Sequence, residues 1–337
     1  MTHPYQDERN AAIEATRQAA RLCQRVQRNM VTEDTLQKKD RSPVTVADFG
    51  AQALVLRHLA QQFDDDPIVG EEAADALRGD ENATLRQRVI DEVRFHVPDA
   101  GDEEVLGWID RGGDEGGKPR FWTLDPIDGT KGFLRGEQYA IALALIVDGQ
   151  VQVATLGCPN LSASFAEGGE GGSLFVAVRG QGCFKVPMDA DSDAADEPVK
   201  ASVQTNPVQA RIVESVEAAH GDHSTHDRIR ESLGIAADSV RLDSQAKYGV
   251  LARGEAEVYL RMPTRKGYRE AIWDQAAGSL VIEEAGGRVT DARGIPLDFT
   301  TGRRLENNRG VIATNGVLHD QVIGTIEAVG ASPTDDS

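Results

Sequence analysis

Trp122-Thr-Leu-Asp-Pro-Ile-Asp-Gly-Thr-Lys131 runs from apolar residues directly into two carboxylates and then into a Gly-Thr pair. The run from Phe121 to Leu124 is predicted to be the end of a short buried strand. Pro126 disfavours helical geometry at the residue before it and fixes a turn, so Asp125 and Asp128 can point into one pocket. Taken alone, the stretch is equally compatible with an ordinary acidic turn closed by Asp-Gly.

The same stretch offers oxygen ligands and a place for a phosphate. The carbonyl of Ile127 lies between the two aspartates, and hard cations prefer clustered carboxylate and carbonyl oxygens. Gly129 permits a close approach of the backbone to a ligand. Thr130 stands where a new segment begins, and unpaired amides or a hydroxyl there can bind a phosphate.

Composition sets the outer limits. With 337 residues, 40% of them hydrophobic, the chain is long enough for two domains or one large layered domain. No apolar run reaches the length of a membrane span and residues 1–10 lack a signal-peptide pattern, so a cytoplasmic protein is expected. Cys23, Cys158 and Cys183 are widely spaced and odd in number, which fits buried thiols in a reducing compartment.

The charge is strongly acidic, with a net value of −19 and a pI near 4.8. Nucleic-acid polymers and anionic membranes are bound through clustered cations, so neither is an expected partner. A small anionic substrate is compatible with this charge where metal ions and a few basic residues reverse it locally. The composition also fits a salt-rich cytoplasm, and stability that does not improve with added salt would count against that hypothesis.

The N-terminal half is predicted to consist of helices packed on a largely antiparallel sheet. Apolar residues at three- and four-residue steps indicate a long amphipathic helix over residues 5–30, and a second helix is expected from about Val46 to Phe63. Asp148-Gly149 lies between two apolar runs and predicts a hairpin, as does the turn at residues 179–182.

A short strand is expected at residues 67–72, where it ends in Glu71 and Glu72. A strand end followed by acids is a frequent place for a metal ligand, although adjacent glutamates more often face solvent. Residues 73–120 are acidic and Gly-rich, and we interpret them as an irregular peripheral excursion with one helix around residues 83–95.

Beyond an acidic, linker-like run at residues 189–197, strand-like and helix-like segments alternate, which predicts a second α/β unit. We therefore expect an N-terminal α+β subdomain at residues 1–197, a C-terminal α/β subdomain at residues 198–330, and a flexible tail at residues 331–337.

Acidic residues fall where the predicted elements begin or end. Asp48 lies near the start of the second helix, Glu71 at a strand end, Asp125 and Asp128 in the central turn, and Asp274 at the start of a later helix. Each has an ordinary explanation; for Asp48 this is a carboxylate that complements a helix dipole. Together they would supply a site for several divalent ions, and a site without His or Cys favours magnesium over zinc.

Three motifs in this order resemble the signatures of the lithium-sensitive, magnesium-dependent phosphomonoesterase superfamily, which includes the inositol monophosphatases. They are Gly70-Glu71-Glu72, Asp125-Pro-Ile-Asp-Gly-Thr130, and Trp273-Asp-Gln-Ala-Ala-Gly278 followed by Glu284-Ala-Gly-Gly287. The resemblance covers most of residues 5–330. It implies the five-layer αβαβα sugar-phosphatase fold, built from two packed subdomains.

Finer matches resemble the 3′(2′),5′-bisphosphate nucleotidase branch of that superfamily. They are Ser42-Pro-Val-Thr-Val-Ala-Asp48, Lys131-Gly-Phe-Leu-Arg-Gly-Glu-Gln-Tyr139, Leu242-Asp-Ser-Gln-Ala-Lys-Tyr248, Val258-Tyr-Leu-Arg261 and Pro296-Leu-Asp-Phe299. Inositol monophosphatases typically continue after Gly-Thr with Thr-Asn-Phe instead of Lys-Gly-Phe-Leu-Arg.

The resemblance implies a site for two or three Mg²⁺ ions that Li⁺ and also Na⁺ would inhibit. The implied metal ligands are Glu71, Asp125, the Ile127 carbonyl, Asp128 and Asp274, with Asp125 bridging two ions. Glu72 could replace Glu71 or support it. Asp48 and Thr130 would orient the attacking water and help to deprotonate it, and the amides of Gly129 and Thr130 would hold the phosphate.

Substrate recognition is implied for the C-terminal subdomain. The positions that match nucleotide and 5′-phosphate ligands of the nucleotidases are His223, Ser244, Lys247 and Arg261, and Asp274 would also face the substrate. Without the resemblance, Ser244 could be a helix N-cap, Lys247 a solvated residue, and His223 and His226 exposed residues at a helix start.

The resemblance therefore predicts an enzyme that removes the 3′-phosphate of 3′-phosphoadenosine 5′-phosphate, giving AMP and phosphate. The sulfated analogue and inositol 1,4-bisphosphate are expected side substrates, and the protein is expected to be a monomer. An inositol monophosphatase is the alternative enzyme, which would need no second-phosphate pocket. A non-catalytic sensor of bisphosphonucleotides is the alternative from another class, and it would need neither Asp48 nor Thr130.

Overall fold

The computed structural model describes residues 4–33, 42–162, 164, 171–189, 195–216, 223–263 and 265–334. Within this part of the chain, seven strands form a first sheet in sequence order: β1 (Ile68–Gly70), β2 (Arg120–Asp128), β3 (Ala140–Val147), β4 (Gln150–Cys158), β5 (Ser173–Val178), β6 (Gly182–Val186) and β7 (Glu197–Val199). Strands β1 and β2 are parallel, and the remaining neighbours are antiparallel.

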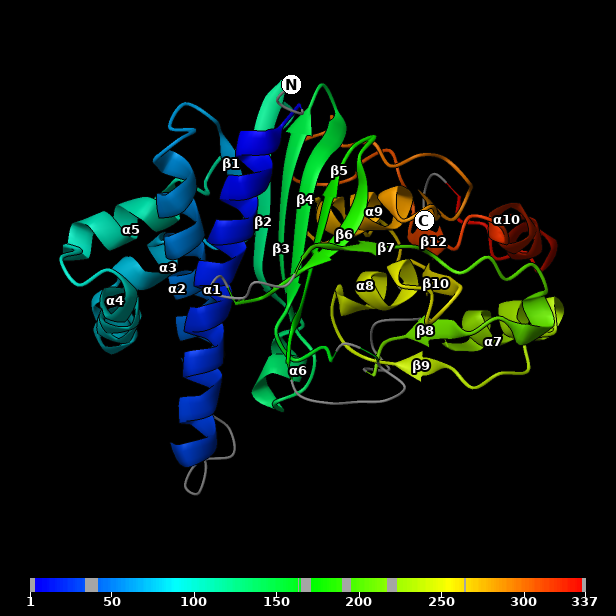
Figure 1. The fold of residues 1–337 in the computed structure, drawn as a ribbon, viewed down its shortest axis with the longest axis horizontal. Coiled ribbons are helices and arrows are strands. Elements are labelled where there is room, and N and C mark those ends of the chain that lie inside the picture. Colours follow the sequence, from blue (N-terminus) through cyan, green and yellow to red (C-terminus); the bar gives the residue numbers. More distant parts are fainter. Residues whose placement is uncertain are drawn as a thin grey trace.

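Two long helices, α1 (Gln6–Glu33) and α2 (Ser42–Ala60), cover one face of this sheet (Figure 1). Their apolar residues pack with the strands in one buried cluster that contains Leu22, Leu54 and Trp122. Both predicted helices are confirmed. Helix α2, however, begins four residues earlier than expected, so Asp48 lies in its second turn and not at its start. Pro43 is compatible with this because the first turn of a helix leaves its N–H groups unpaired.

The predicted irregular excursion at residues 73–120 is wrong in one respect. Besides the expected helix, α4 (Ala83–His96), the segment contains α3 (Asp75–Arg78), the 3₁₀ helix η1 (Asp80–Asn82) and α5 (Asp102–Asp110). Helix α5 has three acidic residues in its first turn, where the helix dipole favours them, and it buries Val105, Leu106 and Ile109 beside α2. These acids concealed a short apolar face in the sequence.

The hairpin predicted at Asp148-Gly149 is confirmed, since both residues have the positive φ angles of such a turn, 48° and 73°. Strands β5 and β6 form the second predicted hairpin. A short helix, α6 (Thr130–Leu134), follows β2 directly. Strand β7 lies across the subdomain boundary that we expect after residue 197, and the division of the chain there remains a proposal.

Within the described residues, the second sheet has the order β11-β12-β10-β8-β9. Its strands are β8 (Ile212–Glu214), β9 (Val240–Arg241), β10 (Val258–Arg261), β11 (Arg288–Thr290) and β12 (Val311–Thr314). A 3₁₀ helix, η2 (Pro207–Gln209), precedes β8. Helices α8 (Ala246–Ala252) and α9 (Ala276–Glu284) lie between the two sheets, and α7 (His223–Leu233) and α10 (His319–Ala328) cover the outer face (Figure 1). The predicted five-layer αβαβα arrangement is thus confirmed.

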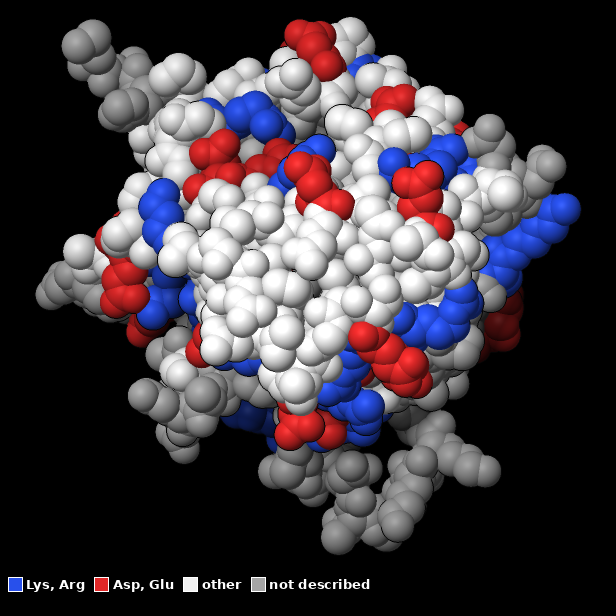
Figure 2. Space-filling view, turned by 90° about the vertical axis from the view of Figure 1, so that its right-hand side faces the viewer, with Lys and Arg blue, Asp and Glu red and all other residues white. Residues whose placement is uncertain are grey.

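Figure 2 shows the outer face of the second unit, where acidic and basic side chains are interspersed around a central area without charge. No helix in the described ranges is both long and apolar enough to cross a membrane. Cys23, Cys158 and Cys183 are free thiols and all are buried, as the sequence predicts. Burial raises the pKa of each thiol well above its ordinary value.

Candidate active site

A β-bulge brings the two aspartates of the central motif to the same side of β2. Asp125 pairs with Ala142 and Asp128 pairs with Ala140, so three residues on β2 span only two on β3. Side chains three residues apart on a regular strand point to opposite faces, and one extra residue restores the same face. The Pro126-Ile127 insertion is therefore the local reason that both carboxylates line one cavity.

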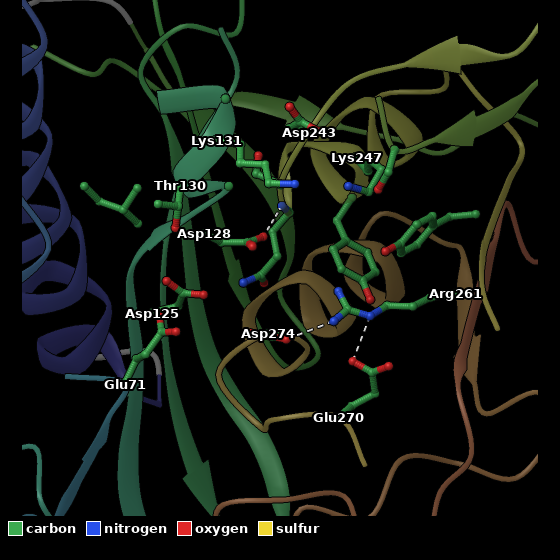
Figure 3. Close-up of a pocket in the computed structure, with 18 of the residues that line it drawn as sticks. Glu71, Asp125, Asp128, Thr130, Lys131, Asp243, Lys247, Arg261, Glu270 and Asp274 are labelled. Carbon is green, nitrogen blue, oxygen red and sulfur yellow. Dashed lines mark hydrogen bonds and ion pairs between the residues drawn. The ribbon is translucent and has the colours of Figure 1, made fainter. Parts of the chain in front are cut away.

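This cavity of about 780 Å³ lies between the two sheets. Figure 3 shows Glu71, Asp125 and Asp128 on one side of it and Lys247 and Arg261 on the other. The structure brings most of the predicted site residues to its walls: Glu71, Asp125, Ile127, Asp128, Gly129, Thr130, Ser244, Lys247, Arg261 and Asp274. Asp48 lies behind the wall, 8% exposed. The side chain of His223 lies outside the described residues.

Three neighbouring carboxyl groups of the cavity have raised pKa values. Burial, followed by the charges of Asp274 and Glu72, raises the pKa of Glu71 to about 8. Burial raises the pKa of Asp274 to about 7 although Arg261 opposes the shift. The pKa of Asp125 lies well above its ordinary value because of burial and the neighbouring Glu71 charge, and these two carboxyl groups share a hydrogen bond.

Within the described part of the chain, two buried carboxylate oxygens have no hydrogen-bond partner, Oδ1 of Asp48 and Oδ1 of Asp125. An uncompensated buried acceptor is costly, so these oxygens require a proton or a cation. Burial and then the charges of Glu72 and Glu71 raise the pKa of Asp48 well above its usual value. The donor set is made only of oxygen, which fits a hard divalent cation.

The carboxylates of the cavity are spread along its wall and are not gathered around one point. Among the described residues, no three His, Cys, Asp or Glu side chains have converged closely enough to hold a metal. Asp128 accepts a hydrogen bond from the backbone amide of Gln245, and Asp274 forms an ion pair with Arg261 at 3.0 Å. These contacts give Asp128 and Asp274 separate partners on the side of the cavity away from Glu71 and Asp125.

The motif that follows β2 also fastens the two units together. Gly129 has a φ of 91°, and a Cβ there would stand 2.7 Å from the Ser244 Cβ, so only glycine permits this approach. Ser244 itself has a positive φ of 68°, which is unusual for a residue with a side chain. Its Oγ accepts a hydrogen bond from the Ala246 backbone amide at 3.1 Å, but the N-cap residue of α8 is Gln245, so the N-cap interpretation of Ser244 is wrong by one residue. The side chain of Ser244 lies in the cavity wall.

Lys247 is buried in the wall of the cavity, 5% exposed, so the alternative interpretation as a solvated side chain is wrong. Its Nζ lies 5.6 Å from the centre of the Tyr259 ring. Burial lowers its pKa to about 8, with Asp128 the strongest of the charges that oppose the shift. A buried ammonium of this kind is a strong ligand for an anion.

Several residues that matter here gave no clear signal in the sequence. Glu270 is buried, and it pairs with Arg261 at 2.7 Å and accepts a hydrogen bond from Gln275 at 3.0 Å. Gln275 in turn accepts from the Tyr248 hydroxyl at 2.5 Å. This buried chain holds Arg261 against Asp274. Glu270 stands only four residues before Asp274, and that spacing of two acids is the signal that could have revealed it.

We expect the metal-free protein to lose stability as the pH rises from about 5 to 8.5. The folded state holds protons on Glu71, Asp125 and Asp274 that the unfolded chain, with carboxyl pKa values near 4, releases. Stability falls with pH wherever the folded state binds more protons. Glu71 faces the water of the cavity, which screens its interactions, so Asp125 and Asp274 contribute most.

The measurement is the melting temperature in EDTA across this pH range, repeated with magnesium. The EDTA curve should fall by several degrees, and magnesium should restore most of the loss at pH 8. A melting temperature in EDTA that stays flat or rises would show that the carboxyl cluster does not hold these protons.

Comparisons with known proteins agree with this geometry. The model of the inositol monophosphatase family matches residues 5–331. The chain is 44% identical to a 3′(2′),5′-bisphosphate nucleotidase of Schizosaccharomyces pombe over 96% of this chain and 95% of the relative. It is also 44% identical to the 3′(2′),5′-bisphosphate nucleotidase of Oryza sativa, with the same coverage of both chains, 96% and 95%.

Solved structures show the same fold at lower identity. The inositol monophosphatase of Anabaena aligns with a TM-score of 0.62 at 19% identity, over 97% of each chain. CysQ of Bacteroides thetaiotaomicron, a bacterial member of the family, aligns with a TM-score of 0.62 at 19% identity, over 93% of this chain and 98% of that one. The chain therefore belongs to the inositol monophosphatase family, on the branch of its bisphosphate nucleotidase relatives.

Proposed function

We propose that this chain is a magnesium-dependent phosphomonoesterase that removes the 3′-phosphate of 3′-phosphoadenosine 5′-phosphate and releases AMP. The observation that carries the substrate is the layout of the cavity, with a carboxylate cluster on one wall and the buried ammonium of Lys247 on the other. The cluster suits a phosphate bound through cations, and the ammonium suits a second phosphate bound directly. The names of the relatives support the same bisphosphate.

The proposed ligands of the two or three Mg²⁺ ions are Glu71, Asp125, the Ile127 carbonyl, Asp128 and Asp274. When bound, magnesium neutralises the phosphate, stabilises the leaving alkoxide and lowers the pKa of a bound water. The partnerless Oδ1 of Asp125 and its place between Glu71 and Asp128 favour Asp125 as the bridging ligand.

Asp48 and Thr130 are proposed to orient the attacking water and to help deprotonate it. The buried Oδ1 of Asp48 has no partner and can take a proton, and the Thr130 hydroxyl lies on the cavity wall. The amides of Gly129 and Thr130 are proposed to hold the phosphate that is cleaved. A sensor without catalytic activity would have no need of both Asp48 and Thr130.

The 5′-phosphate is proposed to bind Ser244 and Lys247, with Arg261 between the two ends of the substrate. Arg261 pairs with Glu270 and Asp274, so it is held by acids and offers only part of its guanidinium to a ligand. His223 stays a proposal from the resemblance alone, as do the sulfated analogue and inositol 1,4-bisphosphate as further substrates. We also propose that lithium and sodium inhibit the enzyme and that the protein is a monomer in the cytoplasm.

The test is a phosphate-release assay with magnesium on 3′-phosphoadenosine 5′-phosphate, inositol 1-phosphate and fructose 1,6-bisphosphate, each with and without lithium. We expect the nucleotide to have the highest kcat/KM, by about 100-fold, because the other two cannot place a second phosphate on Lys247 in the same geometry. Lithium should inhibit all measurable activity.

The outcomes separate the alternatives. Preference for inositol 1-phosphate would replace the nucleotidase with an inositol monophosphatase. Tight binding of the nucleotide without phosphate release would favour the sensor. The Asp125→Asn protein, purified in parallel, controls for contaminating phosphatases.

A further inference from the structure

Arg303 lies in the segment between β11 and β12, yet its guanidinium contacts the opposite unit. Its Nη2 donates a hydrogen bond to the carbonyl of Gly70 at 2.7 Å, and its Nη1 donates to the carbonyl of Asp114 at 2.9 Å. Both carbonyls belong to the N-terminal unit. The two nitrogens of one planar group thus fix two points of that unit, which the single ammonium of a lysine does not reproduce.

The Gly70 carbonyl belongs to the peptide that leads into Glu71. On the other side of Glu71, the buried side chain of Gln52 accepts a hydrogen bond from the Glu72 amide at 3.1 Å and donates to the Glu72 carbonyl at 2.7 Å. The Glu71 amide itself donates to the Leu124 carbonyl at 3.2 Å. The backbone of Glu71 is therefore held on both sides, and Arg303 provides the contact that comes from the second unit.

Arg303 is tied equally closely to the segment that carries Asp274. Its guanidinium carbon lies 4.8 Å from the centre of the Trp273 ring, and Trp273 directly precedes Asp274. The backbone carbonyl of Arg303 accepts a hydrogen bond from the Ile272 amide at 3.1 Å. Two residues further on, the Leu305 amide donates a hydrogen bond to the Glu270 carbonyl at 2.9 Å, which extends the backbone pairing between the two segments.

We propose that Arg303 is a positioning residue that sets the placement of Glu71 relative to Asp274 and thereby the affinity of the site for magnesium. The inference rests on the proposed function, in which both acids are metal ligands. Glu71 directly follows β1 and Asp274 lies just before α9, and the two acids are close enough for the charge of Asp274 to act on Glu71. Cation binding has to draw such ligands together, and a contact that presets their separation lowers the cost of doing so.

The experiment measures magnesium binding by the rise in melting temperature with magnesium concentration, without substrate, and by the activation curve of phosphate release. For Arg303→Ala we expect the half-saturating magnesium concentration to rise about 10-fold or more in both measurements, as is typical for residues that orient metal ligands. At saturating magnesium, kcat should return to within about threefold of the unaltered protein, since Arg303 lies outside the wall of the active-site cavity.

Arg304→Ala is the matched control. This substitution removes the same charge one position away. The guanidinium carbon of Arg304 lies 5.5 Å from the centre of the same Trp273 ring, and the charge of Arg304 also acts on Asp274. Its hydrogen bond at 3.5 Å goes to the Arg269 carbonyl, within its own unit. We expect less than a threefold change in half-saturating magnesium for this variant.

Equal shifts in the two variants would assign the effect to charge alone and overturn the proposal. A lower melting temperature in Arg303→Ala with unchanged half-saturating magnesium would overturn it too, by leaving Arg303 a purely structural residue. Should Arg303→Ala fail to fold, the pair Arg303→Lys and Arg304→Lys gives the same comparison with the charge kept. The absence of any magnesium response in the unaltered protein would instead overturn the proposed function, and this inference with it.

Discussion

Asp125→Asn should reduce kcat/KM for 3′-phosphoadenosine 5′-phosphate by about 1,000-fold or more, because loss of the proposed bridging carboxylate would remove about 4 kcal/mol of transition-state stabilisation. Asp125 is 2% exposed, and its Oδ1 has no hydrogen-bond partner among the residues that the structure describes. Asparagine keeps the shape and can retain the hydrogen bond with Glu71, so the change removes the charge and little else. Magnesium titrations should show a raised half-saturating concentration alongside the lost turnover.

The same variant should be at least as stable as the unaltered protein in EDTA. Asp125 is buried next to Glu71 and Asp128, whose charges disfavour its ionised form, so the folded protein bears the cost of keeping Asp125 protonated. Asparagine is neutral and removes that cost. Catalytic sites commonly sacrifice stability in this way. Near-normal turnover, or a loss of turnover explained by unfolding, would contradict the ligand role.

Asp66→Asn is a suitable control for Asp125→Asn. Asp66 accepts hydrogen bonds from Arg120 and from the Trp122 indole, both at 2.9 Å, at the other end of β2. Removing this charge should lower the melting temperature and leave the magnesium dependence unchanged. The two variants together separate a structural carboxylate near the start of β2 from the proposed metal ligand near its end.

The layered fold and the acid cluster could be predicted from the sequence because their signals are local. Apolar periodicity revealed α1, and Asp148-Gly149 revealed the hairpin between β3 and β4. The Asp125-Pro-Ile-Asp motif carries its own bulge, so even the shared direction of its two carboxylates follows from adjacent residues. Helix α5 was missed because its acidic first turn outweighed the three apolar residues that it buries.

The residues that could not be predicted act across the gap between the units. Nothing near Arg303 in the sequence indicates that it reaches the Gly70 carbonyl, 233 residues away along the chain. The Asp243 carboxylate, which pairs with Arg135 from the loop after α6, is a second case. Such contacts depend on how the two sheets pack, and a local pattern does not encode that packing.

The burial of Lys247 is a third feature that the local sequence does not indicate. Lys247→Ala should raise KM for 3′-phosphoadenosine 5′-phosphate by about 30- to 100-fold, because a charge-assisted hydrogen bond to a phosphate contributes about 2–3 kcal/mol. KM for adenosine 3′-monophosphate, which has no 5′-phosphate, should change little. Lys266→Ala removes an exposed ammonium outside the cavity wall and should leave both values unchanged.

The pH dependence adds an independent test of the same pocket. Burial lowers the pKa of Lys247 to about 8, so the ammonium loses its proton as the pH rises through that value. In the unaltered protein, KM for the bisphosphate should therefore rise above pH 8, whereas Lys247→Ala should not show this rise. An equal effect of Lys247→Ala on the bisphosphate and the monophosphate would remove Lys247 from the 5′-phosphate site and leave it a buried cation that balances Asp128 and Asp274.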